Sequence, residues 1–384
     1  MWSALSGSSN RPRRVRAGRQ LFAAAALAFG ASGGPASWSP TPVRLHRADG
    51  WGRPAVHGSA LYYLTRHHEL YAIKRSTGAT LWRQSLRLAA GRSRTSGTNV
   101  IVERGTVVVG DDDLFAFDAQ TGAMRWHFVA ADGDRPGPYL GASVSGVVYA
   151  GSTTGRIYAL DVASGRTVWI SGPLGARTVV FGPVVEGGLV VAAYTDFANV
   201  RHGGVMALEA STGDLRWHAK FPGGARGLAS GAAGGPVIEA DAIIATSSDG
   251  RIHGFNRTTG ERAWTLPSIA GMSEDFRPLL LCQRTLLVAS LTGLLLAVNT
   301  RTRHESWRYT SPEDGSIVFD IAADADTVYV PFASGRLTAV DLTTGKERWR
   351  VGTNDRRFEQ LPAVADDRVY VTSEDGLYVV AKRQ

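Results

Sequence analysis

Residues 116–126 read Ala-Phe-Asp-Ala-Gln-Thr-Gly-Ala-Met-Arg-Trp, and this phrase decides the fold. It fits the pattern A-x-D-x-x-[ST]-G-x-x-x-W, which recurs with few changes along most of the chain. The closing tryptophans are 42 to 48 residues apart, and a period of this size indicates a propeller or a solenoid. The seven copies cover residues 72–82, 116–126, 159–169, 207–217, 254–264, 297–307 and 339–349.

Each repeat predicts four antiparallel strands. In the last repeat, the runs at residues 368–371 and 377–380 are rich in valine and tyrosine and are separated by Ser, Glu, Asp and Gly. Such an alternation of β-branched runs and turn residues is typical of hairpins, and a four-stranded meander is one propeller blade. We label the strands A to D from the axis outward, so that the valine-rich run is strand B and the tryptophan lies on strand D.

The repeated residues have structural roles. The glycine is expected at positive φ in the C–D turn, the aspartate can accept hydrogen bonds from the turn amides, and the tryptophan buries its ring against the next blade. A catalytic residue is needed once, whereas these recur, so we interpret them as structural. Arg303 stands where the sister repeats have glycine, which predicts the weakest turn there. The structural set is Trp38, Trp82, Trp126, Trp169, Trp217, Trp264, Trp307, Trp349, Asp118, Asp161, Asp341, Gly78, Gly122, Gly165, Gly213, Gly260 and Gly345.

The two ends of the chain predict how the ring closes. Eight copies of strands A to C can be recognised, and the eighth stops before any tryptophan-bearing strand. Trp38 lies 44 residues before Trp82, in phase with the series. We therefore predict an all-β, eight-bladed propeller whose last blade is completed by the N-terminal strand, with Trp38 as the eighth outer-strand tryptophan. Closure of this kind removes open sheet edges.

The repeated phrase resembles the PQQ-like, quinoprotein-type β-propeller repeats over about residues 36–384. The layout is closest to the propeller lipoproteins of the outer-membrane β-barrel assembly machinery, and it is also similar to extracellular propellers of sensor kinases. The quinoprotein dehydrogenases of this family hold PQQ beside a vicinal disulfide, with a calcium ion and a catalytic aspartate. One cysteine, Cys282, rules out that disulfide, and no C-x-x-C-H haem motif is present.

Composition and the N-terminal region predict an exported protein. The formal charge is +8, but residues 1–36 carry five arginines and no acid, which leaves +3 on the remainder and gives no argument for nucleic acid. Arginines up to Arg19, an apolar run at residues 21–31 and small residues up to Ala36 predict a signal peptide over 1–36. The run is too short to span a membrane. It resembles a twin-arginine signal at Arg13 and Arg14 and has no lipobox cysteine.

Other chemistry-bearing residues favour structural explanations. We expect Cys282 to be buried in an inner strand as a small hydrophobe. We expect His67 and His68 to form a solvated B–C turn, and Asp111, Asp112 and Asp113 to form an acidic turn without calcium-loop spacing. No catalytic residue, metal site or cofactor, PQQ included, is therefore predicted.

Irregular loops point to one binding face. A long B–C loop at residues 194–204 and long D–A connections at 131–139, 220–235 and 267–276 emerge at the same end of a meander. Function usually resides on such loops over a rigid scaffold. We expect this B–C/D–A face to bind another protein or a small polar ligand, with Tyr194 as a stacking surface. Its candidate residues are Tyr194, Asp196, Arg201, His202 and Arg226, with Glu274 and Asp275 nearby.

These observations favour an exported, monomeric, non-catalytic scaffold of one propeller domain, residues 37–384, in the cell envelope or outside the cell. One alternative is a ligand-sensing ectodomain that works with a separate signalling chain. A second alternative is a PQQ-dependent dehydrogenase. No nucleic acid and no membrane span are expected.

Overall fold

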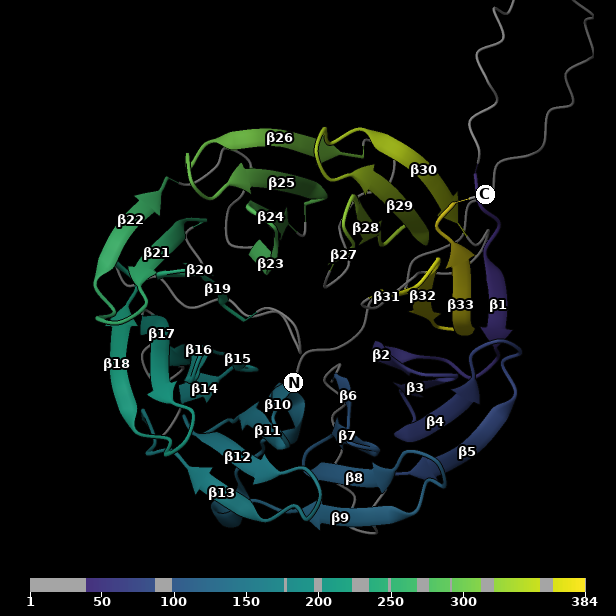
Figure 1. Ribbon diagram of the computed structural model, residues 1–384, viewed down its shortest axis with the longest axis horizontal. Coiled ribbons are helices and arrows are strands. Elements are labelled where there is room, and N and C mark those ends of the chain that lie inside the picture. Colours follow the sequence, from purple (N-terminus) through teal and green to yellow (C-terminus); the bar gives the residue numbers. More distant parts are fainter. Residues whose placement is uncertain are drawn as a thin grey trace, which may run out of the picture. The chain divides into compact units, whose positions relative to one another are not determined.

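The computed structural model describes residues 39–86, 99–175, 178–196, 202–222, 235–247, 250–267, 276–290, 292–311, 321–352 and 362–383, with the backbone alone at 202 and 276–279. All of them fall in one compact unit, Trp38–Gln384. Within this unit, eight antiparallel sheets stand around a central axis as the blades of a propeller (Figure 1). The predicted all-β, eight-bladed fold is confirmed.

Blades 1 to 4 follow one another along the chain, each from its inner to its outer strand. Blade 1 is β2 (Trp51–His57), β3 (Ala60–Leu64), β4 (Glu69–Lys74) and β5 (Thr80–Ser85). Blade 2 is β6 (Val100–Glu103), β7 (Thr106–Gly110), β8 (Leu114–Asp118) and β9 (Met124–Phe128). Blade 3 is β10 (Leu140–Val144), β11 (Val147–Gly151), β12 (Ile157–Asp161) and β13 (Thr167–Ile170). Blade 4 is β14 (Thr178–Val180), β15 (Val184–Glu186), β16 (Leu189–Asp196), β17 (His202–Glu209) and β18 (Leu215–Lys220).

Blades 5 to 8 complete the ring. Blade 5 is β19 (Val237–Glu239), β20 (Ala242–Thr246), β21 (Ile252–Asn256) and β22 (Arg262–Leu266). Blade 6 is β23 (Phe276–Cys282), β24 (Thr285–Ser290), β25 (Leu294–Asn299) and β26 (Glu305–Thr310). Blade 7 is β27 (Ala322–Ala323), β28 (Thr327–Pro331), β29 (Arg336–Asp341) and β30 (Glu347–Gly352). Blade 8 is β31 (Ala363–Ala365), β32 (Arg368–Ser373), β33 (Gly376–Ala381) and β1 (Val43–His46).

The N-terminal strand closes the ring as predicted, but with a different residue at the tryptophan position. In blade 1, Trp82 pairs with Ala72 of strand C; in blade 8, the corresponding pair is Val43 with Val379. Val43 is 58% exposed, however, and the residue that lies against Gly78, the glycine that faces a tryptophan in the regular seams, is Leu45. The assignment of Trp38 to this site is therefore wrong, and Trp38 itself lies outside the described residues.

The hydrophobic core is divided among the eight seams between neighbouring blades, with one cluster in each. In a regular seam the outer-strand tryptophan reaches the next blade. The indole nitrogen of Trp126 donates to the carbonyl of Val162 at 2.9 Å, just after the C strand of blade 3. Equivalent bonds come from Trp82, Trp169, Trp217, Trp307 and Trp349.

The C–D turns also form as predicted. The six motif glycines have φ between 68° and 78°. Asp118 accepts bonds from the Gln120 and Thr121 amides at 3.0 and 2.8 Å; Asp161 and Asp341 cap their turns in the same way. A Cβ on Gly165 would lie 2.6 Å from the Trp126 ring. Glycine is thus required there both by the backbone angle and by the neighbouring blade.

The seam between blades 5 and 6 departs from this pattern. Arg303 takes the glycine position with φ 61°, and its guanidinium carbon lies 5.3 Å from the centre of the Trp264 ring. Trp264 lies over its own blade, because a Cβ on Gly254 would be 2.0 Å from its Cε2 atom. Arg303 therefore has a specific partner in the preceding blade, which the sequence did not indicate.

Candidate binding face

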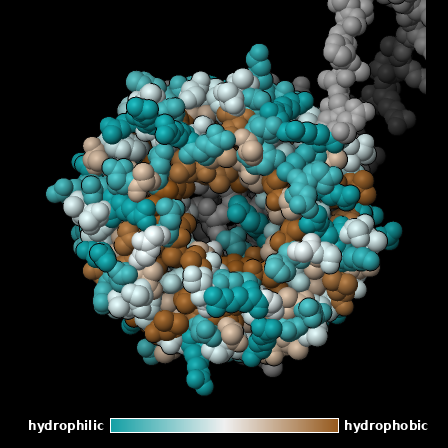
Figure 2. Space-filling model, in the orientation of Figure 1, coloured by the Kyte–Doolittle hydropathy of each residue, from teal (hydrophilic) through white to brown (hydrophobic). Residues whose placement is uncertain are grey.

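The B–C turns and D–A connections emerge at one end of the blades, and the A–B and C–D turns emerge at the other. Figure 2 shows one face of the ring, hollowed at its centre, with hydrophobic residues gathered around the hollow and hydrophilic residues over much of the rim. The strands that border the central hollow are the inner strands of the blades (Figure 1). Residues at the ends of these strands are therefore the ones that a partner at the mouth would meet.

The structure brings together only part of the expected binding site. β16 continues to Asp196 and β17 begins at His202, so most of the expected loop is a longer hairpin. Of His202 only the backbone is described. Arg201, Arg226, Glu274 and Asp275 lie outside the described residues.

Tyr194 is not the exposed stacking surface that we expected. Its side chain is 5% exposed, and its ring packs against Gly204 on β17, where an added Cβ would lie 2.7 Å from the Tyr194 hydroxyl. Burial, reinforced by the nearby Asp196 carboxylate, raises the pKa of Tyr194 to about 12. The strand extension turns this side chain into the seam with blade 3. Asp196, at the end of the strand, stays half-buried.

Side-chain contacts join the B–C turns of blades 1 and 2 to each other and to the connection that follows blade 2; we call this group of contacts the clamp. Nδ1 of His68 lies 2.8 Å from a carboxylate oxygen of Asp111, and Nε2 of His127 lies 2.9 Å from one of Asp113. Arg135, from the D–A connection that follows blade 2, pairs with Asp112. The expected solvated histidine turn is thus wrong for His68, which is 7% exposed because the next blade covers it.

The connection between blades 2 and 3 is ordered by the same clamp. It contains two short 3₁₀ turns, η1 (Ala131–Gly133) and η2 (Gly137–Tyr139). Between them the buried Asp134 accepts bonds from the Tyr158 hydroxyl at 2.8 Å and the Thr153 hydroxyl at 3.1 Å. Gly137 packs so closely on the acidic turn that a Cβ would lie 2.2 Å from the Asp111 carbonyl oxygen. This part of the face is therefore preformed.

A second preformed group lies where the innermost strand of blade 1 begins. Trp51 is the first residue of β2, and the Arg66 guanidinium carbon lies 4.8 Å from the centre of its ring. Arg66 also pairs with Glu374 of the blade 8 B–C turn at 3.6 Å, and its amide donates to Asp49. The indole nitrogen of Trp51 is buried and has no hydrogen-bond partner among the described residues.

The Trp51 group was not predicted from the sequence, although the sequence contains a signal for it. Of the tryptophans in residues 39–384, Trp51 is the one that does not end a copy of the repeated phrase. Arg66 contacts the Trp51 ring, and the partners of Arg66 itself, Asp49 and Glu374, come from two other segments of the chain. No spacing rule links these positions, and only the closed ring brings them together.

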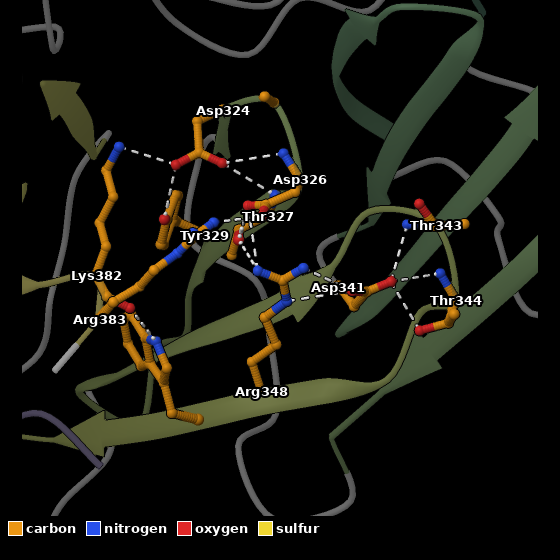
Figure 3. Close-up of polar contacts among 12 residues, drawn as sticks. Asp324, Asp326, Thr327, Tyr329, Asp341, Thr343, Thr344, Arg348, Lys382 and Arg383 are labelled. Carbon is orange, nitrogen blue, oxygen red and sulfur yellow. Dashed lines mark hydrogen bonds and ion pairs between the residues drawn. The ribbon is translucent and has the colours of Figure 1, made fainter. Parts of the chain in front are cut away.

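The opposite face carries structural ion pairs. Near the closing blade, Lys382 pairs with Asp324 at 2.9 Å, and Arg348 bridges Asp326 and Asp341 at 3.1 and 2.7 Å (Figure 3). The Arg348 guanidinium, aided by the Thr344 hydroxyl and amide, lowers the pKa of Asp341 to about 2. The same acid–arginine pair recurs within the C–D hairpins as Asp118–Arg125 and Glu209–Arg216. We interpret these pairs as braces of the outer hairpin.

Cys282 is partly exposed, which corrects the expectation of a buried thiol, and its sulfur donates to the Asp324 carbonyl at 3.3 Å. Within the described residues, no group of three or more His, Cys, Asp and Glu side chains could hold a metal ion. No helix in the described part of the chain is long and apolar enough to cross a membrane. The single cysteine does not fit the vicinal disulfide of quinoprotein dehydrogenases.

Comparisons with known proteins give relatives of more than one kind. The serine/threonine-protein kinase AfsK of Streptomyces griseus is 27% identical over 265 residues, covering 59% of this chain and 32% of the kinase. The outer membrane protein assembly factor BamB of Bordetella pertussis is 27% identical over 229 residues, covering 58% of this chain and 54% of that protein. The chain therefore spans between a third and about half of the length of these curated relatives.

A solved structure and a family model agree on the architecture. BamB from Moraxella catarrhalis superposes with a TM-score of 0.65 at 20% identity, covering 88% of this chain and 95% of that one. At this identity the likeness shows the fold alone. The family model described as outer membrane protein assembly factor BamB matches residues 24–193, 153–314 and 291–382. Because these matches cover nearly the whole chain, the protein belongs to this family of PQQ-like β-propellers.

Proposed function

We propose that this protein is an exported, non-catalytic propeller that binds another protein, or a small polar ligand, through its B–C/D–A face. The observation that carries the proposal is the preformed group of Trp51, Arg66 and Glu374 at the mouth. An aromatic ring with a guanidinium above it offers stacking and charge together. Because surrounding turns hold both side chains, little conformational entropy is lost on binding.

The names of the relatives favour a protein partner. The assembly factors are named for a role in building outer-membrane proteins, and their match covers more than half of this chain. We therefore favour a protein of the cell envelope as the partner of this chain. We further propose that residues 1–36 are a signal peptide, that residues 37–384 form a single domain, and that the exported protein is a monomer.

The test compares both faces of the ring in one binding assay. Trp51→Ala, Arg66→Gln and a replacement of residues 196–202 by Asp-Gly alter the B–C/D–A face, and Arg216→Gln alters the other face as a matched control. Chemical cross-linking in the native envelope, followed by mass spectrometry, measures the yield of each cross-linked partner. We expect the three mouth variants to lose partner cross-links and the control to keep them. Loss with the Arg216 variant alone, or with variants at Asp118, Asp161 and Asp341, would place binding on the opposite face.

A sensing role is the second candidate, since a kinase is among the relatives over 59% of this chain. In that case the mouth would take a small ligand, and a signalling chain would be a separate protein. A thermal-shift screen of polar metabolites distinguishes this from a protein scaffold. A PQQ-dependent dehydrogenase is the third, and near-ultraviolet absorption after incubation with PQQ and calcium tests it directly.

A further inference from the structure

The outer strand of blade 3 differs from every other outer strand of the ring. Each of the other seven carries at least one arginine, for example Arg83 on β5 and Arg308 on β26. Strand β13 reads Thr167-Val168-Trp169-Ile170 and carries no charged residue. Charged side chains on edge strands prevent the addition of a foreign strand. Among the eight outer strands, all of which the structure describes, β13 alone lacks this protection.

The free edge of β13 is oriented for pairing. β12 is the one strand hydrogen-bonded to it (Figure 1). The Ser171 amide, just beyond the strand, donates inward to the Ile157 carbonyl at 2.9 Å. Backbone groups of successive strand residues point to alternate sides, so the amide and carbonyl of Ile170 point outward. The side chains of Val168 and Ile170 are 48% and 44% exposed beside them.

A groove of about 660 Å³ lies beside this edge, between the outer parts of blades 2 and 3. Ile170 and Pro173 line one side, Phe128 and Val129 the other, and the buried Tyr158 lies among them. Val129, at 61% exposed, is the most exposed of the large hydrophobic side chains described. An apolar groove next to an open strand edge suits an extended peptide, which adds backbone bonds and inserts alternate side chains.

The charges of the groove indicate which kind of side chain an incoming peptide strand would carry. Asp132 is exposed at its rim and Asp134 lies deeper, whereas Arg156 is the one cationic lining residue. The Arg156 guanidinium is directed to the Ser171 carbonyl at 3.3 Å, and Asp134 is held by Tyr158 and Thr153. Asp132 makes no such bond to a described residue, and its carboxylate leaves the rim acidic. A basic side chain on the incoming strand would complement it.

We propose that β13 is a docking edge for an extended segment of a partner protein. The segment adds as a further strand to blade 3, seats a large apolar side chain between Val129 and Ile170, and places a lysine or arginine at Asp132. This site on the outer edge of blade 3 is separate from the binding site proposed at the mouth of the propeller, and it does not use Trp51 or Arg66.

The probe is a set of dodecamer peptides selected from a random display library on the purified full-length protein, with affinities measured by fluorescence polarisation. Val168→Arg blocks the edge, and Leu81→Arg is its control. Both residues precede the motif tryptophan, are similarly exposed at 48% and 51%, and occupy a position where Arg125, Arg216 and Arg348 occur naturally. Ile170→Arg is a second edge variant that copies Arg83 and Arg308.

We expect selected peptides to alternate apolar residues and to carry a basic residue. Both edge variants should weaken their binding by about tenfold or more, while Leu81→Arg and Trp51→Ala leave it unchanged. N-methylation of alternate peptide amides should abolish it. Peptides that bind the edge variants as tightly as the wild type, or that tolerate N-methylation, would overturn strand addition. If sedimentation equilibrium shows self-association that Val168→Arg abolishes, the occupant is a second copy of this chain, and the assignment to a partner is wrong.

Discussion

The seam between blades 2 and 3 and the seam between blades 5 and 6 are built from the same phrase in different ways. In the first, Trp126 reaches across the seam, donates to the Val162 carbonyl and lies over Gly165. In the second, Trp264 lies over Gly254 of its own blade, and Arg303 covers it from the next blade. The turn glycine of one blade and the tryptophan of the preceding blade therefore depend on each other. Where the tryptophan ring lies elsewhere, the turn position no longer requires glycine.

Removing each tryptophan should give the largest difference between the seams. Trp126→Ala should lower the free energy of unfolding by about 3–5 kcal/mol, as truncation of a buried tryptophan does. Trp264→Ala should cost at least about 1 kcal/mol less, because this ring is partly exposed and makes no cross-seam hydrogen bond to a described residue. Urea unfolding of both variants measures the difference. Equal losses would mean that the two seams contribute alike.

Adding one methyl group at the turn glycine should give the next largest effect, and it tests the regular seam between blades 2 and 3. At Gly165, with φ 68°, alanine adopts a disfavoured backbone angle and overlaps the Trp126 ring. We expect Gly165→Ala to destabilise by about 1–2 kcal/mol from the backbone and further from the overlap. Gly172→Ala, where nothing lies within 4 Å of an added Cβ, is the matched control in the same blade. The comparison fails if both variants unfold at the same urea concentration.

The regular seam could be predicted from the sequence, because its parts repeat. The period and the turn glycine recur in most blades, and the capping aspartate recurs in three, so each copy supports the others. The parts that failed occur once. Trp38 was placed by counting residues, whereas in the structure Val43 pairs with Val379 and Leu45 lies against Gly78. Tyr194 was assigned to a loop, but the extension of β16 buries it.

Contacts between turns of different blades were also beyond the sequence. His68 meets Asp111, and Arg66 meets Trp51 and Glu374, only because the ring brings their turns together. The spacing of these residues follows no periodic rule. The absence of charge on β13, by contrast, can be read from its four residues. What the sequence does not show is that the outer strand of every blade is a sheet edge.

Arg303→Gly should show how far the irregular seam has adapted. Glycine relieves the φ of 61°, a gain of about 1 kcal/mol, but removes the guanidinium from the Trp264 ring, a loss of about 0.5–1 kcal/mol. We expect a change in stability of less than about 1 kcal/mol, in which these effects offset each other. In a Trp264→Ala background the same substitution should stabilise, since the contact is already gone. A large loss in either background would point to another partner of Arg303.

The smallest expected effect is a difference in the pH dependence of stability between C–D turns capped by a carboxylate and those capped by an amide. Asp341 caps the blade 7 turn and binds Arg348, which lowers its pKa from 3.8 to about 2; Asn299 caps the blade 6 turn and cannot ionise. A carboxylate with a lowered pKa in the folded state stabilises the protein above the unfolded pKa, and this stabilisation is lost as the pH falls through the folded value. Asp341→Asn should therefore be less stable than the wild type at neutral pH, and the gap should close between about pH 4 and pH 2.

The matched control for this prediction is Asp161→Asn. Asp161 caps its turn through Ser164, but Val168 stands where Asp341 has Arg348, so no arginine of its own hairpin pairs with it. We expect its pH-dependent loss to be smaller than that of Asp341→Asn in the same urea titrations. If both variants lose the same stability across this range, the turn hydrogen bonds account for the effect. The acid–arginine pairs of blades 2, 4 and 7 would then add no pH-dependent stability beyond that of the turn hydrogen bonds.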